Sequence, residues 1–213
     1  SAEGELSVSS NGKKENVIWG ELLEKGKVEK DRVKIEMVSP HGKEWLHVRI
    51  EDGNTGLPVA ARVHFRTQNG AYVAPHGHQA DVNIAWFEDI GGDCKVNGVP
   101  YAYIDGKFQI DMPVGSVYAE VVRGFEYEPV RRLIDVKPGQ KDLTIKIDRA
   151  FDMKKRGYYS GDTHVHFLSS QSAHLEATAE DLNVTHLLVS QWGRLFTSWE
   201  EFTGGLAPTS TDN

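Results

Sequence analysis

The chain has 213 residues, enough for one large domain or two modest ones. Its 24 Lys and Arg residues and 31 Asp and Glu residues give a net charge of −7, and both signs are spread along the chain. This distribution argues against nucleic acid or an anionic membrane surface as a partner, because both require basic clusters. The sequence contains no run of about 20 apolar residues and therefore no predicted membrane span.

The first 42 residues are predicted to form an N-terminal lead-in segment. Residues 1–16 are small and polar, and we expect them to be flexible. Residues 17–38 combine an apolar patch, a charged stretch and one expected strand. The segment has the pattern of neither a signal peptide nor a transit peptide, but it fits what remains after such a peptide is cleaved.

Residues 43–150 consist of short alternating runs separated by turn residues, which predicts a β-sandwich domain. Strands are expected at 45–50, 59–67, 81–90, 101–110, 116–136 and 143–147. The Asp105-Gly106 pair inside one of these runs predicts a tight hairpin. The single cysteine, Cys94, cannot form an internal disulfide, so cysteine usage does not identify the redox compartment.

After residue 150 the pattern changes to that of an α/β domain, and we place a domain boundary near 148–157. A strand is expected at 161–168, and a second, largely apolar strand at 184–193. Between them a helix is predicted, because Leu175, Ala179 and Leu182 form an apolar stripe. Ser172 is its expected N-cap and Asn183 its expected stop signal. Strand, helix and strand over about 30 residues predict a βαβ unit with a parallel sheet.

The first of these strands carries the strongest candidate site, Asp162-Thr-His164-Val-His166. In a regular strand residues two apart share a face and lie about 6.5–7 Å apart along it. Imidazoles in this arrangement can ligate one metal ion or two adjacent ions. Asp162 is suited to ligate as well, or to orient an imidazole. We prefer metal binding here to a buried structural role.

Four other positions are weaker candidates. His76 and His78 flank a glycine in a loop, where histidines are more often solvated than bound to a metal. Glu176 and Glu180 lie at i and i+4 on the predicted helix, where a solvated face is the simpler interpretation.

The end of the second strand is a further candidate region. Gln191 and Arg194 follow this strand and are weak candidates for pocket residues. Trp192 and Trp199 are better explained by packing. The sequence contains no serine-centred elbow, P-loop or dinucleotide fingerprint.

The stretch "GYYSGDTHVHF", residues 157–167, resembles the opening strand of the polymerase-and-histidinol-phosphatase (PHP) metallohydrolases, and more narrowly of the CehA/McbA-like branch. This resemblance extends to residue 205. The preceding sandwich more loosely resembles transthyretin-like or carboxypeptidase-regulatory-like modules. The resemblance implies a distorted (β/α) barrel with two or three divalent metal ions (Zn, Mn or Fe). It also implies hydrolysis of phosphoester bonds, or in this branch of carbamate or related ester bonds.

Residue by residue, the resemblance assigns His164 and His166 to the first metal-ligand motif and Asp162 to the acid beside it. The sequence departs from the family where many members end the second strand with an acidic residue and a histidine, because it has Ser190-Gln191-Trp192 there. The segment 151–213 is also far shorter than the roughly 200–250 residues of a closed barrel. We therefore expect a truncated PHP domain whose remaining ligands come from the rest of the barrel or from another copy of the chain.

Three functions fit the sequence. The first is the N-terminal part of a divalent-metal-dependent hydrolase acting on a small-molecule substrate, in which this chain alone lacks a complete active site. The second is a non-catalytic β-sandwich that binds sugar, peptide or a protein surface through aromatic residues within 70–87 and 100–106, with an inactive βαβ appendage. The third is a purely structural or oligomerising sandwich. A polar start and scarce cysteine favour a periplasmic or secreted location over the cytoplasm.

Overall fold

The computed structural model describes residues 3–10, 13–30, 33–37, 42–83, 89–188 and 204–205. The chain is mainly β, as the sequence predicts, and no sheet formed by these described residues is closed. The strands are β1 (Glu5–Ser10), β2 (Lys13–Ile18), β3 (Lys27–Lys30), β4 (Val33–Glu36), β5 (Lys43–Asp52), β6 (Ala61–Thr67), β7 (Asp93–Val96), β8 (Val99–Ile104), β9 (Lys107–Pro113), β10 (Gly115–Val122), β11 (Val130–Val136), β12 (Asp142–Ile147), β13 (Gly161–Val165) and β14 (Val184–Leu187). The helices are α1 (Trp19–Lys25), the 3₁₀ turn η1 (Lys154–Arg156) and α2 (Ser170–Ala179).

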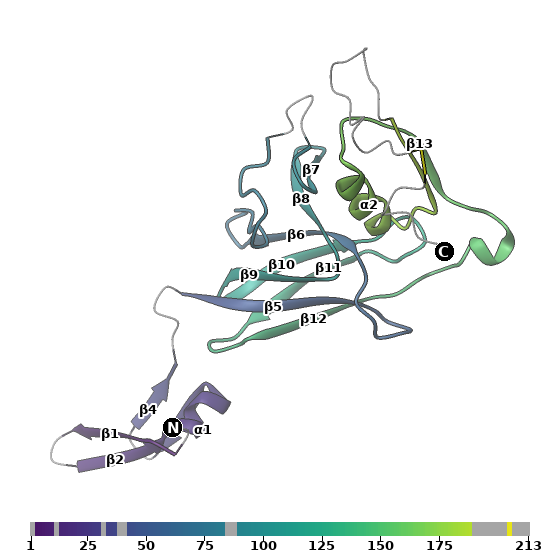
Figure 1. Cartoon of the computed structure of the whole chain (residues 1–213). Helices are drawn as coiled ribbons and strands as arrows, with labels where there is room; N and C mark the ends of the chain where they lie inside the picture. The colour runs from purple at the N-terminus through teal and green to yellow at the C-terminus, as the bar shows by residue number, and fades with distance from the viewer. Residues whose placement is uncertain are drawn as a thin grey trace.

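Two sheets within residues 43–150 share the main hydrophobic core, and we call this region the two-sheet body (Figure 1). One sheet has the strand order β11-β10-β6-β8-β7, and the other has the order β12-β5-β9. Along β5 buried and exposed residues alternate, so that Leu46, Val48 and Ile50 face the core. Phe65 on β6 faces them from the other sheet and is also fully buried.

The Asp105-Gly106 turn does not form the predicted hairpin. It connects β8 to β9, which belong to different sheets, so it carries the chain across the core. The tight hairpin joins β7 to β8 instead, at Asn97 and Gly98, whose φ angles of 52° and 82° fit a type I′ turn. The hairpin prediction was wrong because an Asp-Gly pair specifies a left-handed turn but not which strands pair across it.

The described residues of the segment 81–90, where a strand was expected, do not form one. Residues 81–83 and 89–90 are irregular, and residues 84–88 lie outside the described residues. Val82 is fully buried without belonging to a strand. In the described residues 81–83 the alternating pattern indicates burial of Val82 but no strand.

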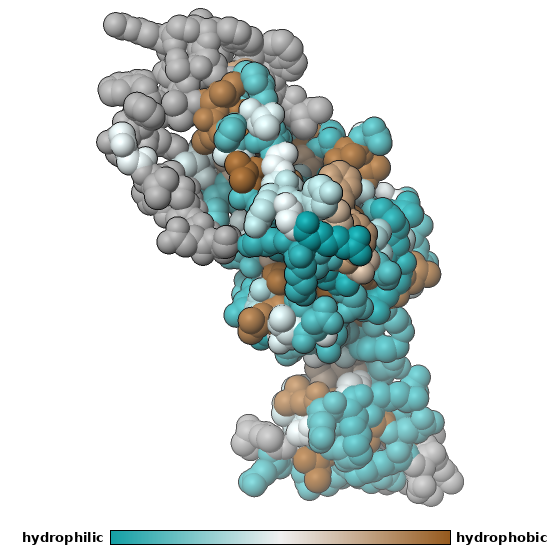
Figure 2. All heavy atoms as spheres, turned by 90° about the vertical axis from the view of Figure 1, so that its right-hand side faces the viewer, coloured by the Kyte–Doolittle hydropathy of each residue, from teal (hydrophilic) through white to brown (hydrophobic). Residues whose placement is uncertain are grey.

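The N-terminal residues form a small unit with its own core, at one end of the molecule in Figures 1 and 2. The strands β1 and β2 pair as an antiparallel hairpin, and β3 pairs with β4. Val17, Leu22 and Val28 are buried together between them. The described residues 5–10 and 13–16 of the segment expected to be flexible are instead paired in β1 and β2, whose backbone groups bond to each other.

The segment after residue 150 contains the predicted βαβ arrangement, since β13 and β14 are parallel neighbours and α2 lies between them in the chain. The N-cap lies three residues before the predicted one: it is Ser169, whose side chain accepts a hydrogen bond from the backbone N–H of Ser172. The helix ends at Ala179, before Asn183, so Leu182 of the predicted stripe lies beyond it. Neither α1 nor α2 has the length and apolarity to cross a membrane, and these are the α-helices of the described residues.

The helix α2 packs against the two-sheet body over β6 and β8 and against β14 (Figure 1). Its buried Ala179 contacts a small apolar cluster with Ala60 and Tyr103, and Leu175 adds to it. The close approach depends on Gly124, because a Cβ there would collide with the backbone carbonyl of Glu180. The α/β segment therefore uses the body as a packing partner.

Candidate functional site

The two imidazoles of the main sequence motif lie together at the end of β13. The ring centroids of His164 and His166 are 4.5 Å apart, with the ring planes at 61°. Both residues are exposed. Phe167 has a φ of 62°, so the chain turns sharply after the second histidine. We call the exposed surface formed by these two residues the histidine face.

Asp162 does not follow the regular alternation that the sequence suggested. One of its carboxylate oxygens, Oδ1, accepts a hydrogen bond from the backbone N–H of His164 at 3.0 Å. The pairing of β13 with β14 shifts register between Asp162 and Val165, and these two residues line one cavity that the histidines do not line. Asp162 thus fixes the backbone at the strand end, and a direct ligand role for its carboxylate stays a prediction.

That cavity, of about 150 Å³, lies between α2, β13 and β14 and contains both glutamates of the predicted helix. Glu180 accepts a hydrogen bond from the hydroxyl of Tyr103 at 2.9 Å and lies 3.3 Å from the guanidinium of Arg62. These contacts give Glu180 a structural role. Burial raises the pKa of Glu176 to about 7, and the nearby carboxylates of Asp89 and Glu180 add to the effect. Glu176 therefore changes its charge near neutral pH.

The remaining candidates after β14 lie outside the described residues: Gln191, Arg194, Trp192 and Trp199. A pocket role for Gln191 and Arg194 stays a prediction. Within the described parts of the chain, no three His, Cys, Asp or Glu side chains are gathered closely enough to hold a metal ion.

His78 has a more ordered setting than the sequence suggested for a loop histidine. Its Nδ1 atom lies 2.9 Å from Oδ1 of Asp93, and Asp93 also accepts the backbone N–H of Gln79 at 3.0 Å. The side chain of Asp93 is only 3% exposed. Both His76 and His78 line a hollow of about 370 Å³ between the body and α2. Nothing in the sequence connects His78 to Asp93, because they are 15 positions apart.

Among the aromatic residues proposed for a binding module, Trp86 and Phe87 lie outside the described residues, and Tyr72 is partly buried. Tyr101 and Tyr103 are 9% and 8% exposed, so they belong to the interior. Exposed aromatic side chains occur elsewhere and include Trp45, Phe125 and Tyr158. The face in Figure 2 is largely hydrophilic, with apolar side chains in separate small patches. These patches give no reason to place a protein docking surface on that face.

Cys94, on β7, is not a candidate nucleophile. Burial raises the pKa of its thiol to about 11, against a smaller opposite effect from the guanidinium of Arg62. The reactive form of a cysteine is the thiolate. At neutral pH Cys94 therefore behaves as a small, half-buried packing residue.

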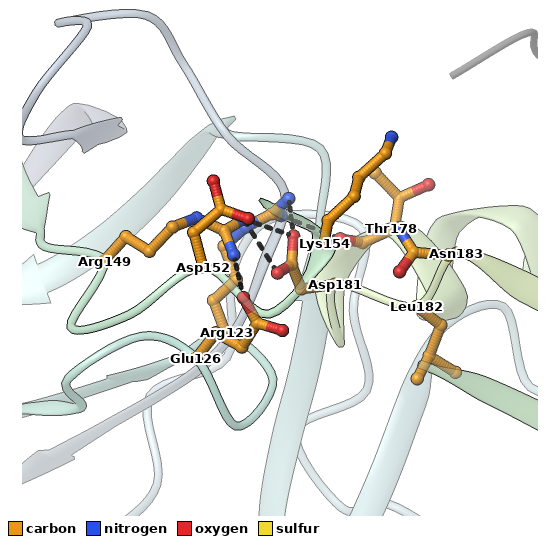
Figure 3. A pocket seen from close by; sticks show the side chains of 9 residues that line it. All are labelled: Arg123, Glu126, Arg149, Asp152, Lys154, Thr178, Asp181, Leu182 and Asn183. Atoms are coloured by element: carbon orange, nitrogen blue, oxygen red, sulfur yellow. Dashed lines mark hydrogen bonds and ion pairs between the residues drawn. The ribbon is translucent and has the colours of Figure 1, made fainter. Parts of the chain in front are cut away.

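A charged hollow of about 360 Å³ at the joint between the body and α2 was not found by sequence reasoning (Figure 3). Asp181 lies 2.9 Å from the guanidinium of Arg123 and 2.8 Å from that of Arg149. Arg149 also contacts Glu126, at 2.6 Å. These charges are paired with one another, so we interpret the cluster as an electrostatic tie that holds the end of α2 against the body.

No protein-family model, curated protein or solved structure matches the chain. The functional argument therefore rests on the residues themselves and their arrangement.

Proposed function

We propose that the chain is the N-terminal part of a divalent-metal-dependent hydrolase, with His164 and His166 as metal ligands. The observation that carries the proposal is the histidine face, with two exposed imidazoles whose centroids lie 4.5 Å apart at the end of a parallel strand. In parallel α/β folds, active sites form at the carboxyl ends of the strands. Exposed imidazoles at that position are free of the burial that would favour a purely structural role.

The finer fold assignment belongs to the same proposal. The parallel pair β13 and β14 with α2 is the first βαβ unit of a PHP-type barrel of the CehA/McbA-like branch. The two-sheet body is a transthyretin-like or carboxypeptidase-regulatory-like sandwich. In this account the body supports the site indirectly, because it packs against α2 and α2 packs against β14. The comparisons neither support nor oppose this assignment.

The donor set fits a Zn, Mn or Fe ion, since imidazole nitrogen is a common ligand of all three. A bound ion would supply an activated water and polarise the scissile phosphoester, carbamate or ester bond of a small-molecule substrate. His164 and His166 would be its imidazole ligands. Asp162 would act as a positioning residue, because its carboxylate already holds the backbone of His164.

Two imidazoles are too few ligands for a hydrolytic metal centre, which needs at least three protein ligands. The proposal therefore includes ligands from the rest of the barrel or from another copy of the chain. Weak metal binding by this chain, with tighter binding and activity in the complete assembly, follows from that requirement.

Elemental analysis of purified protein tests the proposal. The protein is first equilibrated by dialysis against a fixed Zn²⁺ concentration, and the variants His164→Ala and His166→Ala should each lose most of the Zn²⁺ that the wild type then binds. The matched control is His174→Ala, which removes an exposed imidazole from α2. Metal that stays at the wild-type level in both strand variants would overturn the proposal, and its loss in a His76→Ala or His78→Ala variant would move the site to the body.

A further inference from the structure

The hollow lined by His76 and His78 is independent of the histidine face. It occupies about 370 Å³ and is formed by the loop of His76 and His78, the β8–β9 connection and one helical residue, Leu175. Its volume falls in the range of small-molecule sites. It lies where α2 meets the body, so residues from both parts contribute to it.

Backbone and side-chain contacts hold the histidine loop in one arrangement. The backbone N–H of His76 donates to the carbonyl of Gln109 on β9 at 2.7 Å, and that of His78 donates to the carbonyl of Pro75 at 3.0 Å. The ring of His76 packs edge-on against Trp45, with 5.1 Å between centroids. The loop is therefore pre-organised rather than solvated and free, which reduces the entropy lost when a ligand binds.

The imidazole of His78 is fixed by a buried carboxylate. Because a carboxylate accepts hydrogen bonds, Nδ1 of His78 is the donor to Asp93. This arrangement leaves Nε2 as the ring nitrogen available to a ligand. Asp93 cannot turn away easily, since it is buried and also holds the backbone N–H of Gln79.

The polar groups of the hollow are balanced in charge. Lys107 supplies a positive charge and Asp105 a negative one. Gln109 supplies an amide whose nitrogen lies 3.3 Å from Nδ1 of His47, which leaves its oxygen as an acceptor. An anionic ligand would meet Asp105 and a cationic ligand would meet Lys107. A hydroxyl group both donates and accepts, so it can use every one of these partners.

Apolar side chains complete the lining. Ile104, Phe108 and Leu175 give the hollow an apolar surface. Trp45 stands beside His76 on the adjoining sheet face and is 41% exposed, where it can stack on a second ring. A saccharide presents hydroxyl edges and apolar C–H faces together, which matches this combination.

We propose that this hollow binds a neutral saccharide, with His78, Gln109 and the Asp105/Lys107 pair as its polar contacts. The proposal does not depend on the hydrolase assignment, because it uses none of the residues of the histidine face. A saccharide site on the body and a metal site on the α/β segment can each exist without the other.

The test follows the histidine ring signals of the full 213-residue chain by NMR during titration with the methyl glycosides of glucose, galactose and mannose. At least one neutral glycoside should shift the signals of His76 and His78 saturably, with a dissociation constant on the order of 1 mM for a ligand of this size. Glucuronate and glucosamine should bind more weakly than the corresponding neutral sugar. The His78→Ala variant should weaken binding about tenfold, and the control His174→Ala should leave it unchanged.

A second variant keeps the test informative if His78→Ala fails to fold. Asp105 is exposed, and Asn at this position keeps a side-chain oxygen for the backbone N–H of Lys107. Asp105→Asn should therefore fold, leave the charge of Lys107 unbalanced and increase the affinity for glucuronate. The proposal is overturned if no neutral glycoside shifts these signals, or if glucuronate binds best to the wild type. It is also overturned if only Zn²⁺ perturbs the two rings.

Discussion

The two-sheet body and the α/β segment that follows it are stabilised in different ways. The body has a continuous apolar core to which both sheets contribute, and strands such as β5 alternate buried and exposed residues along their length. In the α/β segment, β13 has no fully buried residue, and α2 buries only Ala173 and Ala179. The described part of the segment is held to the body by a small apolar cluster around Ala179 and by the charged contacts of Asp181 with Arg123 and Arg149. This difference explains how the histidine face stays open while the strand that carries it is held in place.

The largest effect should come from the core of the body. Phe65→Ala removes a fully buried ring at the centre of the main cluster and should lower the free energy of unfolding by about 3–5 kcal/mol. Val165→Ala, at a half-buried position on β13, should cost less than about 1.5 kcal/mol. Chemical denaturation followed by circular dichroism measures both. Equal costs would contradict the contrast between the two regions.

The next effect should come from Glu176 and depend on pH. Below its ordinary pKa near 4.5 the carboxyl is protonated in both the folded and the unfolded states and contributes no pH dependence. Between 4.5 and about 7 the unfolded state ionises first, so folding stability falls as pH rises, and the loss is complete above about 7. The total is at most about 3 kcal/mol, reduced by solvent screening of the half-buried group.

Glu176→Gln should remove this dependence. The variant should be more stable than the wild type at pH 8 and closer to it at pH 4, as measured by urea denaturation at both values. A difference in stability that does not change with pH would show that Glu176 ionises normally in the folded protein.

A smaller effect is expected at the electrostatic tie. Asp181→Asn removes the carboxylate that both Arg123 and Arg149 contact, and it should cost about 2 kcal/mol because these side chains are only 11–26% exposed. The exposed pair of Lys137 and Asp135 provides the control, since Asp135→Asn should change stability by less than about 0.5 kcal/mol. Limited proteolysis should also cut near residue 181 faster in the Asp181 variant. Identical digestion rates would show that the tie does not hold α2.

Sequence patterns predicted the strands of the body well where apolar alternation and burial coincide, as along β5 and β10. They did not predict which strands pair with each other. The turn at Gly106 was assigned to a hairpin because local residues do not specify which sheet the next strand joins. Helix α2 was predicted, but its N-cap at Ser169 was missed, because Ser169, Ser170 and Ser172 all have side chains that can cap a helix.

The candidate site was only partly readable from the sequence. The spacing of His164 and His166 placed both imidazoles at one strand end, but the register shift that separates Asp162 from them has no sequence signal. The contacts of His78 with Asp93, and of Asp181 with two arginines, join residues far apart in the chain. Only the three-dimensional fold brings such pairs together.

The most direct test of the central claim is a Zn²⁺ titration of the full chain, observed through the ring signals of its nine histidines. The account predicts that the signals of His164 and His166 shift together at the lowest metal concentrations, while His174 and His186 stay unchanged. A first response from His76 and His78, or an equal response from all exposed histidines, would contradict a metal site at the end of β13.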